Sequence, residues 1–247
     1  MTHHYYKKQG FTLAEVLITL GIIGIVAALT IPALVGNYQK EVTVTALKKM
    51  YSTLYQAAHM YQAQNGITFE EFDTSLDGKS FIANYFKPYL HIIKECNGFS
   101  QCYDKNPLAI DRKTDYRNIY YIAVLSDGSY LGITSVPTGK LFYFDINGKK
   151  GPNYSGRDIF SFYLINKSTI SENQGCASVL KTLESGIYPG GYAGCYVPFT
   201  KYTRDELLST TVDRSCNRNA NALGDSYDAC AAVIMMDGWK IARDYPW

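Results

Sequence analysis

Six cysteines are the residues of this 247-residue chain whose chemistry is most distinctive. None belongs to a C-x-x-C pair, and no histidine follows His91, so the sequence does not favour a zinc site. In an exported protein an even set of cysteines forms disulfides, whereas in the cytosol it stays as scattered thiols. The N-terminus must decide between these two interpretations. All six lie beyond residue 95: Cys96, Cys102, Cys176, Cys195, Cys216 and Cys230.

A second group of candidate ligands lies between residues 144 and 158. Lys149 occupies the place of the third ligand of an EF-hand loop, and Asn-Gly and Gly-Pro-Asn are common turn sequences. We therefore favour a structural turn, with calcium binding as the alternative. The oxygen-bearing side chains that could surround a calcium ion are Asp145, Asn147, Asn153 and Asp158.

Catalysis requires a set of reactive groups that the sequence does not supply. Beyond residue 10 the chain keeps only His59 and His91, and no serine or cysteine motif accompanies either. The glycine-rich residues 189–194 lack the Gly-Lys-Ser/Thr of a phosphate-binding loop. With 24 Lys and Arg against 22 Asp and Glu, the charge of +2 does not favour nucleic acid as the main partner. We predict that the protein is not an enzyme and that it needs no cofactor, calcium apart.

The elements that must position these groups begin with an apolar N-terminal segment. Residues 11–35 contain a single charged side chain, Glu15, and would span about 37 Å as a helix, enough to cross a bilayer. Lys7 and Lys8 precede the segment, which favours a cytoplasmic N-terminus. Because a carboxylate inside a membrane is unfavourable, Glu15 needs an explanation. One explanation is an ordinary signal peptide that is cleaved after Ala28.

A more specific explanation comes from residues 10–34, which read GFTLAEVLITLGIIGIVAALTIPAL. The short basic leader, Gly10, Phe11 and Glu15, followed by the long apolar helix, resemble the class III leader of type IV pilins and of the pseudopilins of type II secretion. The resemblance is strongest over residues 8–65. It implies that a prepilin peptidase cleaves between Gly10 and Phe11 and methylates the new amine of Phe11. Glu15 could then pair with that amine, on its own or a neighbouring subunit.

Small residues and one proline lie within the apolar segment. Gly21, Gly24 and Ala28 form a strip of the kind that lets membrane helices approach one another. Pro32 has no backbone N–H to donate and is expected to kink or loosen the helix near it. Gly21, Gly24 and Pro32 therefore join Glu15 as candidate assembly residues.

Beyond the apolar segment the pattern continues as an amphipathic helix. Apolar residues recur at spacings of three and four from Val44 to Tyr61, and Asn65-Gly66 is a helix stop. Residues 11–64 are therefore predicted to form one helix.

The rest of the chain predicts a mixed domain. Its Asp127-Gly128 dipeptide is a strong hairpin signal. A long helix followed by antiparallel strands is an α+β plan, which matches the pilin-like fold that the resemblance implies: a long N-terminal α-helix packed on an antiparallel β-sheet head. The expected elements are a short helix at 79–90, strands at 119–125, 129–134, 141–146 and 158–164, and a final hairpin of 229–236 with 239–242.

The predicted organisation has four parts. They are a prepilin leader at 1–10, a transmembrane and assembly half of the helix at 11–35, an amphipathic half at 36–65, and an extracytoplasmic disulfide-bonded head at 66–247. In the head we predict bridges between neighbours: Cys96–Cys102, Cys176–Cys195 and Cys216–Cys230. A C-terminal loop bounded by a disulfide is similar to that of many pilins. Three bridges and a large head depart from a typical major pilin and favour a minor or specialised subunit.

These expectations describe a structural subunit of a type IV pilus or a type II secretion pseudopilus. Its expected partners are other pilin or pseudopilin subunits, a prepilin peptidase/methyltransferase, an inner-membrane assembly platform and the lipid bilayer. It would cross the inner membrane once, with its N-terminus in the cytoplasm, and then enter an extracytoplasmic filament. One alternative is an ordinarily secreted or membrane-anchored disulfide-bonded binding domain that does not polymerise. Another is a surface-binding subunit whose loops at 186–203 and 217–228 contact a surface, a glycan or DNA.

Overall fold

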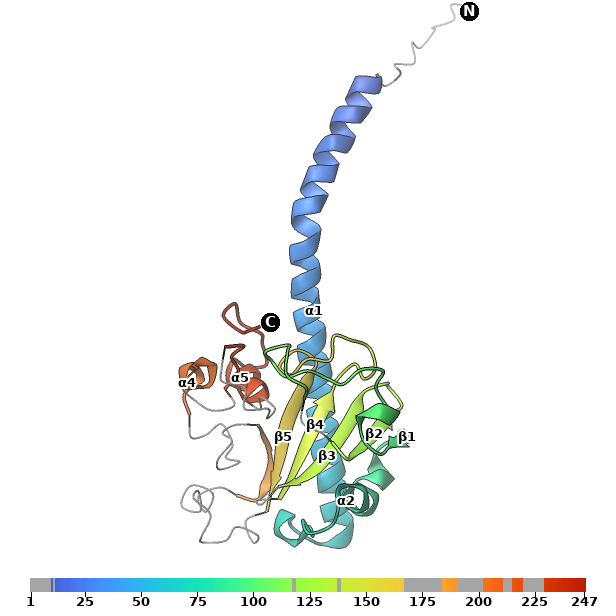
Figure 1. The fold of residues 1–247 in the computed structure, drawn as a ribbon, viewed down its shortest axis with the longest axis vertical. Helices are drawn as coiled ribbons and strands as arrows, with labels where there is room; N and C mark the ends of the chain where they lie inside the picture. Colours follow the sequence, from blue (N-terminus) through green and yellow to red (C-terminus); the bar gives the residue numbers. More distant parts are fainter. Residues whose placement is uncertain are drawn as a thin grey trace, which may run out of the picture. The chain divides into compact units, whose positions relative to one another are not determined.

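The computed structural model describes residues 10, 12–116, 119–136, 139–166, 184–190, 202–210, 215–219 and 229–247. The chain divides into two compact units, Met1–Val42 and Thr43–Trp247. Helix α1 (Leu13–Asn65) contributes to both, and the second unit also holds the sheet and the remaining helices (Figure 1). The predicted α+β class, a long helix followed by an antiparallel sheet, is confirmed.

Helix α1 has 53 residues, which correspond to about 80 Å of helix. It ends where the sequence predicts, because Gly66 has a φ of 68° and the N–H groups of Gly66 and Ile67 both donate to the carbonyl of Gln62. This left-handed residue satisfies carbonyls of the last turn and directs the chain away from the helix. The helix runs without interruption through Pro32, so the loosening expected there is not seen in this structure.

The second unit contains one six-stranded sheet in which every neighbouring pair is antiparallel and the spatial order equals the chain order. The predicted hairpin at Asp127-Gly128 is confirmed, since it joins the second and third strands. Four predicted strands are present, and the two edge strands were not predicted. The strands are β1 (Ile92–Cys96), β2 (Tyr121–Leu125), β3 (Tyr130–Val136), β4 (Gly139–Asp145), β5 (Ile159–Ile165) and β6 (Gly186–Pro189).

Short helices surround the sheet. The helix expected at 79–90 is present as α2 (Gly78–Tyr85) and a following 3-10 turn, with the Asp77 side chain accepting from the N–H groups at the start of α2. Helix α5 (Cys230–Met236) lies beside β5, and α4 (Arg204–Leu208) lies beside α5 (Figure 1).

The final hairpin predicted from residues 229–242 is wrong, because residues 230–236 form α5. A short apolar run is compatible with either a strand or a buried helix, and here all residues from Cys230 to Ile234 are buried. Asp237-Gly238 ends this helix instead of turning a hairpin: Gly238 has a φ of 68°, and the N–H of Trp239 donates to the carbonyl of Ile234 at 2.8 Å.

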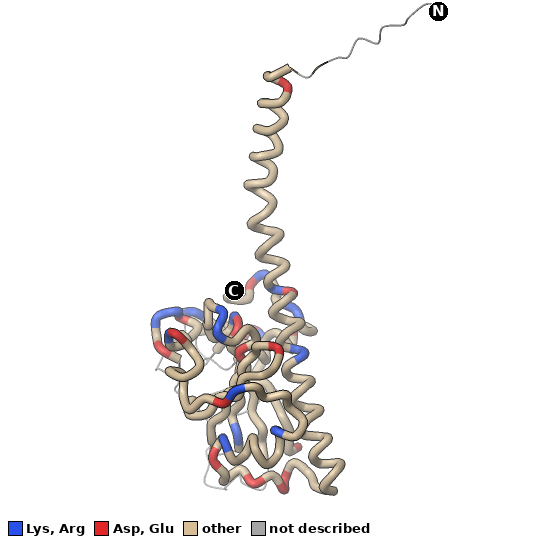
Figure 2. The backbone as a smooth tube through the Cα atoms, turned by 90° about the vertical axis from the view of Figure 1, so that its right-hand side faces the viewer, with Lys and Arg blue, Asp and Glu red and all other residues tan. Residues whose placement is uncertain are grey.

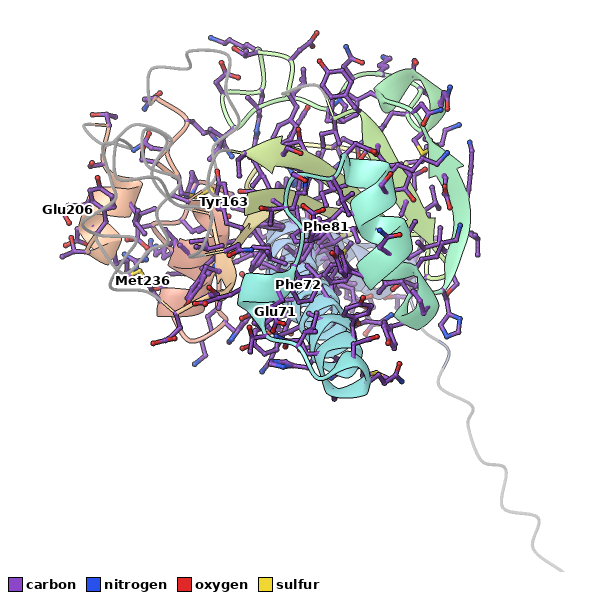
Figure 3. The ribbon with its side chains drawn as sticks, turned by 90° about the horizontal axis from the view of Figure 1, so that it is seen from below. Glu71, Phe72, Phe81, Tyr163, Glu206 and Met236 are labelled. Atoms are coloured by element: carbon purple, nitrogen blue, oxygen red, sulfur yellow. A yellow bond between two sulfur atoms is a disulfide. The ribbon has the colours of Figure 1, made fainter. Side chains whose placement is uncertain are left out.

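The sheet has an apolar core on each face. On one face Phe142, Phe144 and Phe162 belong to a cluster with Leu47 and Leu54 of α1. The other face carries a second cluster, which the connection between β1 and β2 helps to cover. Because both faces are covered, every residue of β4 and β5 is buried. Figure 3 shows Phe72 and Phe81 beside one another in the first cluster, with ring centroids 6.1 Å apart.

Two buried polar side chains attach the segment after α1 to the sheet. The amide of Asn166 donates to the carbonyls of Glu70 and Phe72 at 3.0 and 2.9 Å, and the ammonium of Lys140 donates to the carbonyl of Leu76. Both side chains are essentially inaccessible to solvent. They supply donors to backbone carbonyls of the 3-10 turn at residues 69–71 and of the loop that follows it.

Candidate functional site

The predicted assembly segment is an exposed apolar helix in the first unit. In its most apolar window of 18 residues no side chain is buried, and by length and composition it is the one helix among the described residues that could cross a membrane. Figure 2 shows no Lys, Arg, Asp or Glu along it between Glu15 and Lys40. Apolar surface of this extent needs lipid or other protein chains to cover it.

Glu15 lies at the start of this helix and engages Thr12. The backbone N–H and the hydroxyl of Thr12 both donate to Glu15 Oε2 at 2.8 Å, and the N–H of Glu15 donates to Thr12 Oγ1 at 3.3 Å. This reciprocal pair is a capping box, which satisfies N–H groups that have no partner inside the helix. Thr12, the partner of Glu15 in this cap, was not predicted from the sequence. Its signal was present as Thr-x-x-Glu before an apolar run.

The other predicted assembly residues lie along the same helix without contacts. A Cβ atom added at Gly21 or Gly24 would meet nothing within 4 Å, so the described chain does not require a glycine at either position. Gly10 is described and equally open, whereas Phe11 lies outside the described residues. The small-residue strip is therefore accessible in this structure. Cleavage between Gly10 and Phe11 and the role of the strip in assembly stay predictions.

Two of the three predicted disulfides are present. Cys96 and Cys102 bridge the end of β1 to the following 3-10 turn, and Cys216 is bonded to Cys230 at the start of α5. The predicted bridge of Cys176 with Cys195 falls outside the described residues. Most of the loop residues predicted to contact surfaces also fall outside them, although 186–189 form β6.

The four candidate calcium ligands do come together in the connection between β4 and β5. The Asp158 side chain accepts from the N–H groups of Asn153 and Tyr154 at 2.8 and 2.6 Å and from the amide of Asn147 at 3.2 Å. Asp145 accepts from the N–H groups of Asn147 and Gly148 at 3.2 and 2.7 Å, and from the hydroxyl of Tyr103, a residue of the second core cluster, at 2.7 Å. The two carboxylates thus organise the backbone of the connection.

Both carboxyl groups are almost completely buried, and this changes their acidity. Burial raises the pKa of Asp145 well above its ordinary value, and the neighbouring carboxylate of Asp158 raises it further. Burial also raises the pKa of Asp158, although the N–H groups that it accepts from oppose the change. Burial and the nearby Asp145 raise the pKa of Tyr103 as well, so its hydroxyl stays a donor.

This geometry is that of a hydrogen-bonded turn. Among the described residues no group of three or more His, Cys, Asp or Glu is arranged to hold a metal ion. The carboxylate oxygens already accept from backbone N–H groups, from the amide of Asn147 and from the hydroxyl of Tyr103, which supports the turn that the sequence favoured. Calcium binding stays an untested alternative.

Two parts of the chain match two different protein-family models. Residues 5–31 match the prokaryotic N-terminal methylation motif, and residues 33–247 match a family of unknown function, DUF6613. The second match covers most of the chain and includes the whole sheet. No solved structure matches the chain significantly.

Two curated relatives match the N-terminal part. The type II secretion system core protein G of Pectobacterium carotovorum subsp. carotovorum is 37% identical over 60 residues, which are 24% of this chain and 38% of that protein. The protein of the same name from Escherichia coli (strain K12) is 37% identical over 59 residues, or 24% of this chain and 40% of that protein. The chain thus spans about two fifths of the length of these relatives.

These matches confirm the resemblance to pilins and pseudopilins, and they place it in the N-terminal segment. Residues 33–247, which include the sheet, belong to a family of unknown function. The protein is therefore a pilin-like member of the DUF6613 family, with a prokaryotic N-terminal methylation motif at its start.

Proposed function

We propose that this protein is a structural subunit of a type IV pilus or type II secretion pseudopilus, cleaved between Gly10 and Phe11, methylated at Phe11 and assembled through its N-terminal helix. The observation that carries the proposal is the methylation motif at residues 5–31, which contains Gly10, Phe11 and Glu15 in register. The exposed apolar surface of residues 13–35 supports it, because packing against copies of this helix or related ones would cover that surface.

Before assembly the subunit would wait in the inner membrane, with residues 1–10 in the cytoplasm and the disulfide-bonded head outside. The disulfides of the head support this orientation, since such bonds persist in oxidising compartments. A prepilin peptidase/methyltransferase and an assembly platform in the membrane are the partners that this route requires. The same proposal includes the division of the chain into a leader (1–10), a membrane and assembly half of the helix (11–35), an amphipathic half (36–65) and a head (66–247).

We propose further that the subunit is a minor or specialised one, because its head is large and carries several disulfides. The experiment is to express the chain with a complete pilus or pseudopilus system and to shear filaments from the cells. Quantitative mass spectrometry of the sheared fraction should detect the subunit at a small fraction of the major subunit. A subunit that is exported and oxidised but absent from filaments would favour the non-polymerising domain instead.

A further inference from the structure

A hollow of about 560 Å³ lies on the long connection between β1 and β2. Its floor is apolar, since it includes Phe99 and Tyr116, which are 6% and 4% exposed. The Cys96–Cys102 disulfide holds the turn that carries Phe99, and the ring of Tyr116 packs edge-on against Tyr143 with centroids 5.3 Å apart. The floor therefore rests on the second core cluster and is expected to be rigid.

The rim of the hollow is polar and has spare hydrogen-bonding capacity. Asn97, Ser100, Asn106 and Asp115 line it, and all four are exposed. The amide of Asn106 donates to Asp115 Oδ2 at 3.3 Å, which aligns an amide and a carboxylate side by side. This arrangement offers both donors and acceptors to a ligand.

Tyr120 completes the rim with a large exposed ring. Its exposed fraction is 73%, although the preceding residue, Ile119, is buried at 4%. Within the described part of the chain the Tyr120 hydroxyl makes no hydrogen bond and the ring stacks on no other ring. Folding gains little from an aromatic side chain in this state, whereas a ligand could use its apolar face.

The chemistry of the hollow selects a ligand that has both an apolar face and several hydroxyl groups. Among the residues that the structure describes, the lining has one acidic group, that of Asp115, and neither Lys nor Arg. A sugar ring presents C–H groups on one face, which pack on an aromatic ring, while its hydroxyls donate to a carboxylate and accept from an amide. We propose that this hollow binds a neutral hexose unit of a glycan, with Tyr120 as the platform and Asn106 and Asp115 as the polar contacts.

This proposal concerns the head and does not depend on cleavage or filament assembly. It can be tested on the full chain in a zwitterionic detergent, because a maltoside detergent would itself present a sugar. Saturation-transfer NMR would use the methyl glycosides of glucose, galactose, mannose and N-acetylglucosamine as separate probes. At least one should receive saturation on its ring protons and titrate with a dissociation constant in the millimolar range.

Three variants make the test specific. Tyr120→Ala should weaken binding about tenfold or more, and Tyr120→Phe should stay within about twofold, because the ring provides the contact. Ile93→Ala is the matched control, since Ile93 is 67% exposed on β1 but does not line the hollow. Both positions are exposed, so thermal unfolding of all three variants should be unchanged.

Three results would overturn the proposal. The first is the absence of saturation transfer to all four glycosides at about 50 mM. The second is a Tyr120→Ala chain that binds as well as the unaltered chain. The third is tighter binding of methyl glucuronide than of methyl glucoside, which would show that the hollow prefers an anion.

Discussion

Thr12 and Glu15 hold one another at the start of α1, and both donors of Thr12 end on the same carboxylate oxygen, Oε2. Within the described residues, the second oxygen of Glu15 accepts no hydrogen bond. One side chain can therefore cap its own helix and still offer an oxygen to a positively charged amine. Capping and the proposed pairing with the amine of Phe11 are compatible roles.

The two roles respond differently to substitution. Glu15→Gln keeps a capping box, because Gln also serves at this position, but it removes the negative charge. Thr12→Ala removes the hydroxyl of the capping box, keeps the backbone N–H that donates to Glu15, and keeps the charge. We expect Glu15→Gln to abolish incorporation into filaments and Thr12→Ala to reduce it only modestly, as measured by immunoblot of sheared filaments.

Export provides the control for both variants, since the head should still reach the oxidising side and form its disulfides. If Glu15→Gln enters filaments at the normal level, Glu15 is only a capping residue. If Thr12→Ala is lost to the same extent as Glu15→Gln, the capped helix start is what assembly needs.

The sequence predicted the elements whose signals are local. The amphipathic pattern and the left-handed Gly66 locate the end of α1, and Asp127-Gly128 locates a hairpin. The same dipeptide, at Asp237-Gly238, led to the wrong prediction of a hairpin. Gly128 and Gly238 both have positive φ, and the surrounding packing decides whether the chain forms a hairpin or ends a helix there. The edge strands β1 and β6 show no clear apolar pattern in the sequence, because each strand is short and only a few of its residues lie on a covered face.

The candidate site was predicted in the same uneven way. The N-terminal motif is a continuous string, so Gly10, Phe11 and Glu15 could be recognised directly. The burial of Asp145 and Asp158 could not, because it depends on Tyr103 and on the covering of both faces of the sheet. The sequence therefore favoured a turn here from its Asn-Gly and Gly-Pro-Asn sequences, but it could not show which donors the two carboxylates accept from.

Replacing Asp145 by Asn is expected to leave the free energy of unfolding at pH 7 unchanged or to increase it. The Asn oxygen can still accept from the N–H groups of Asn147 and Gly148, the Tyr103 hydroxyl can accept from its amide, and position 145 no longer carries an ionisable group beside Asp158. The matched variant is Asp158→Asn, in which only one oxygen remains for donors that now use two. We expect it to lose about 1–3 kcal/mol in urea unfolding.

The pH dependence of these variants follows from the raised pKa of Asp145. The folded chain keeps the Asp145 proton to higher pH than the unfolded chain, whose pKa is near the ordinary value of 3.8. Asp145 therefore favours folding below that value and loses this contribution as the pH rises through its folded pKa. The stability of Asp145→Asn relative to the unaltered chain should increase across this window. Two results would contradict this account. One is a free energy of unfolding that changes with pH in the same way for Asp145→Asn and the unaltered chain, and the other is a greater loss of that free energy in Asp145→Asn than in Asp158→Asn.

Asn166→Ala should loosen the segment that follows α1. The carbonyls of Glu70 and Phe72 would lose their donor, at a cost of about 1–3 kcal/mol, and hydrogen exchange of residues 68–77 should become faster. Asn65→Ala is the control, because Asn65 donates to one carbonyl at an exposed helix end and should cost about 0.5 kcal/mol or less. Equal effects of the two substitutions would show that Asn166 does not anchor the segment.

Calcium at millimolar concentration should not stabilise the protein if the connection between β4 and β5 is a hydrogen-bonded turn. The measurement is a thermal unfolding curve with added calcium, compared with one in chelator and one with added magnesium. A rise of the melting temperature by several degrees with calcium alone would show that the protein binds calcium. Asn147 Oδ1, which is buried without a partner among the described residues, would then be the first ligand to test.

The mature N-terminus tests the central claim most directly. The chain should be produced together with a prepilin peptidase and studied by intact-mass measurement and N-terminal sequencing. Our account predicts a protein that begins at N-methylated Phe11. A protein that begins at Leu29 would contradict it, because cleavage after Ala28 is the product of an ordinary signal peptide and removes Glu15 from the secreted chain.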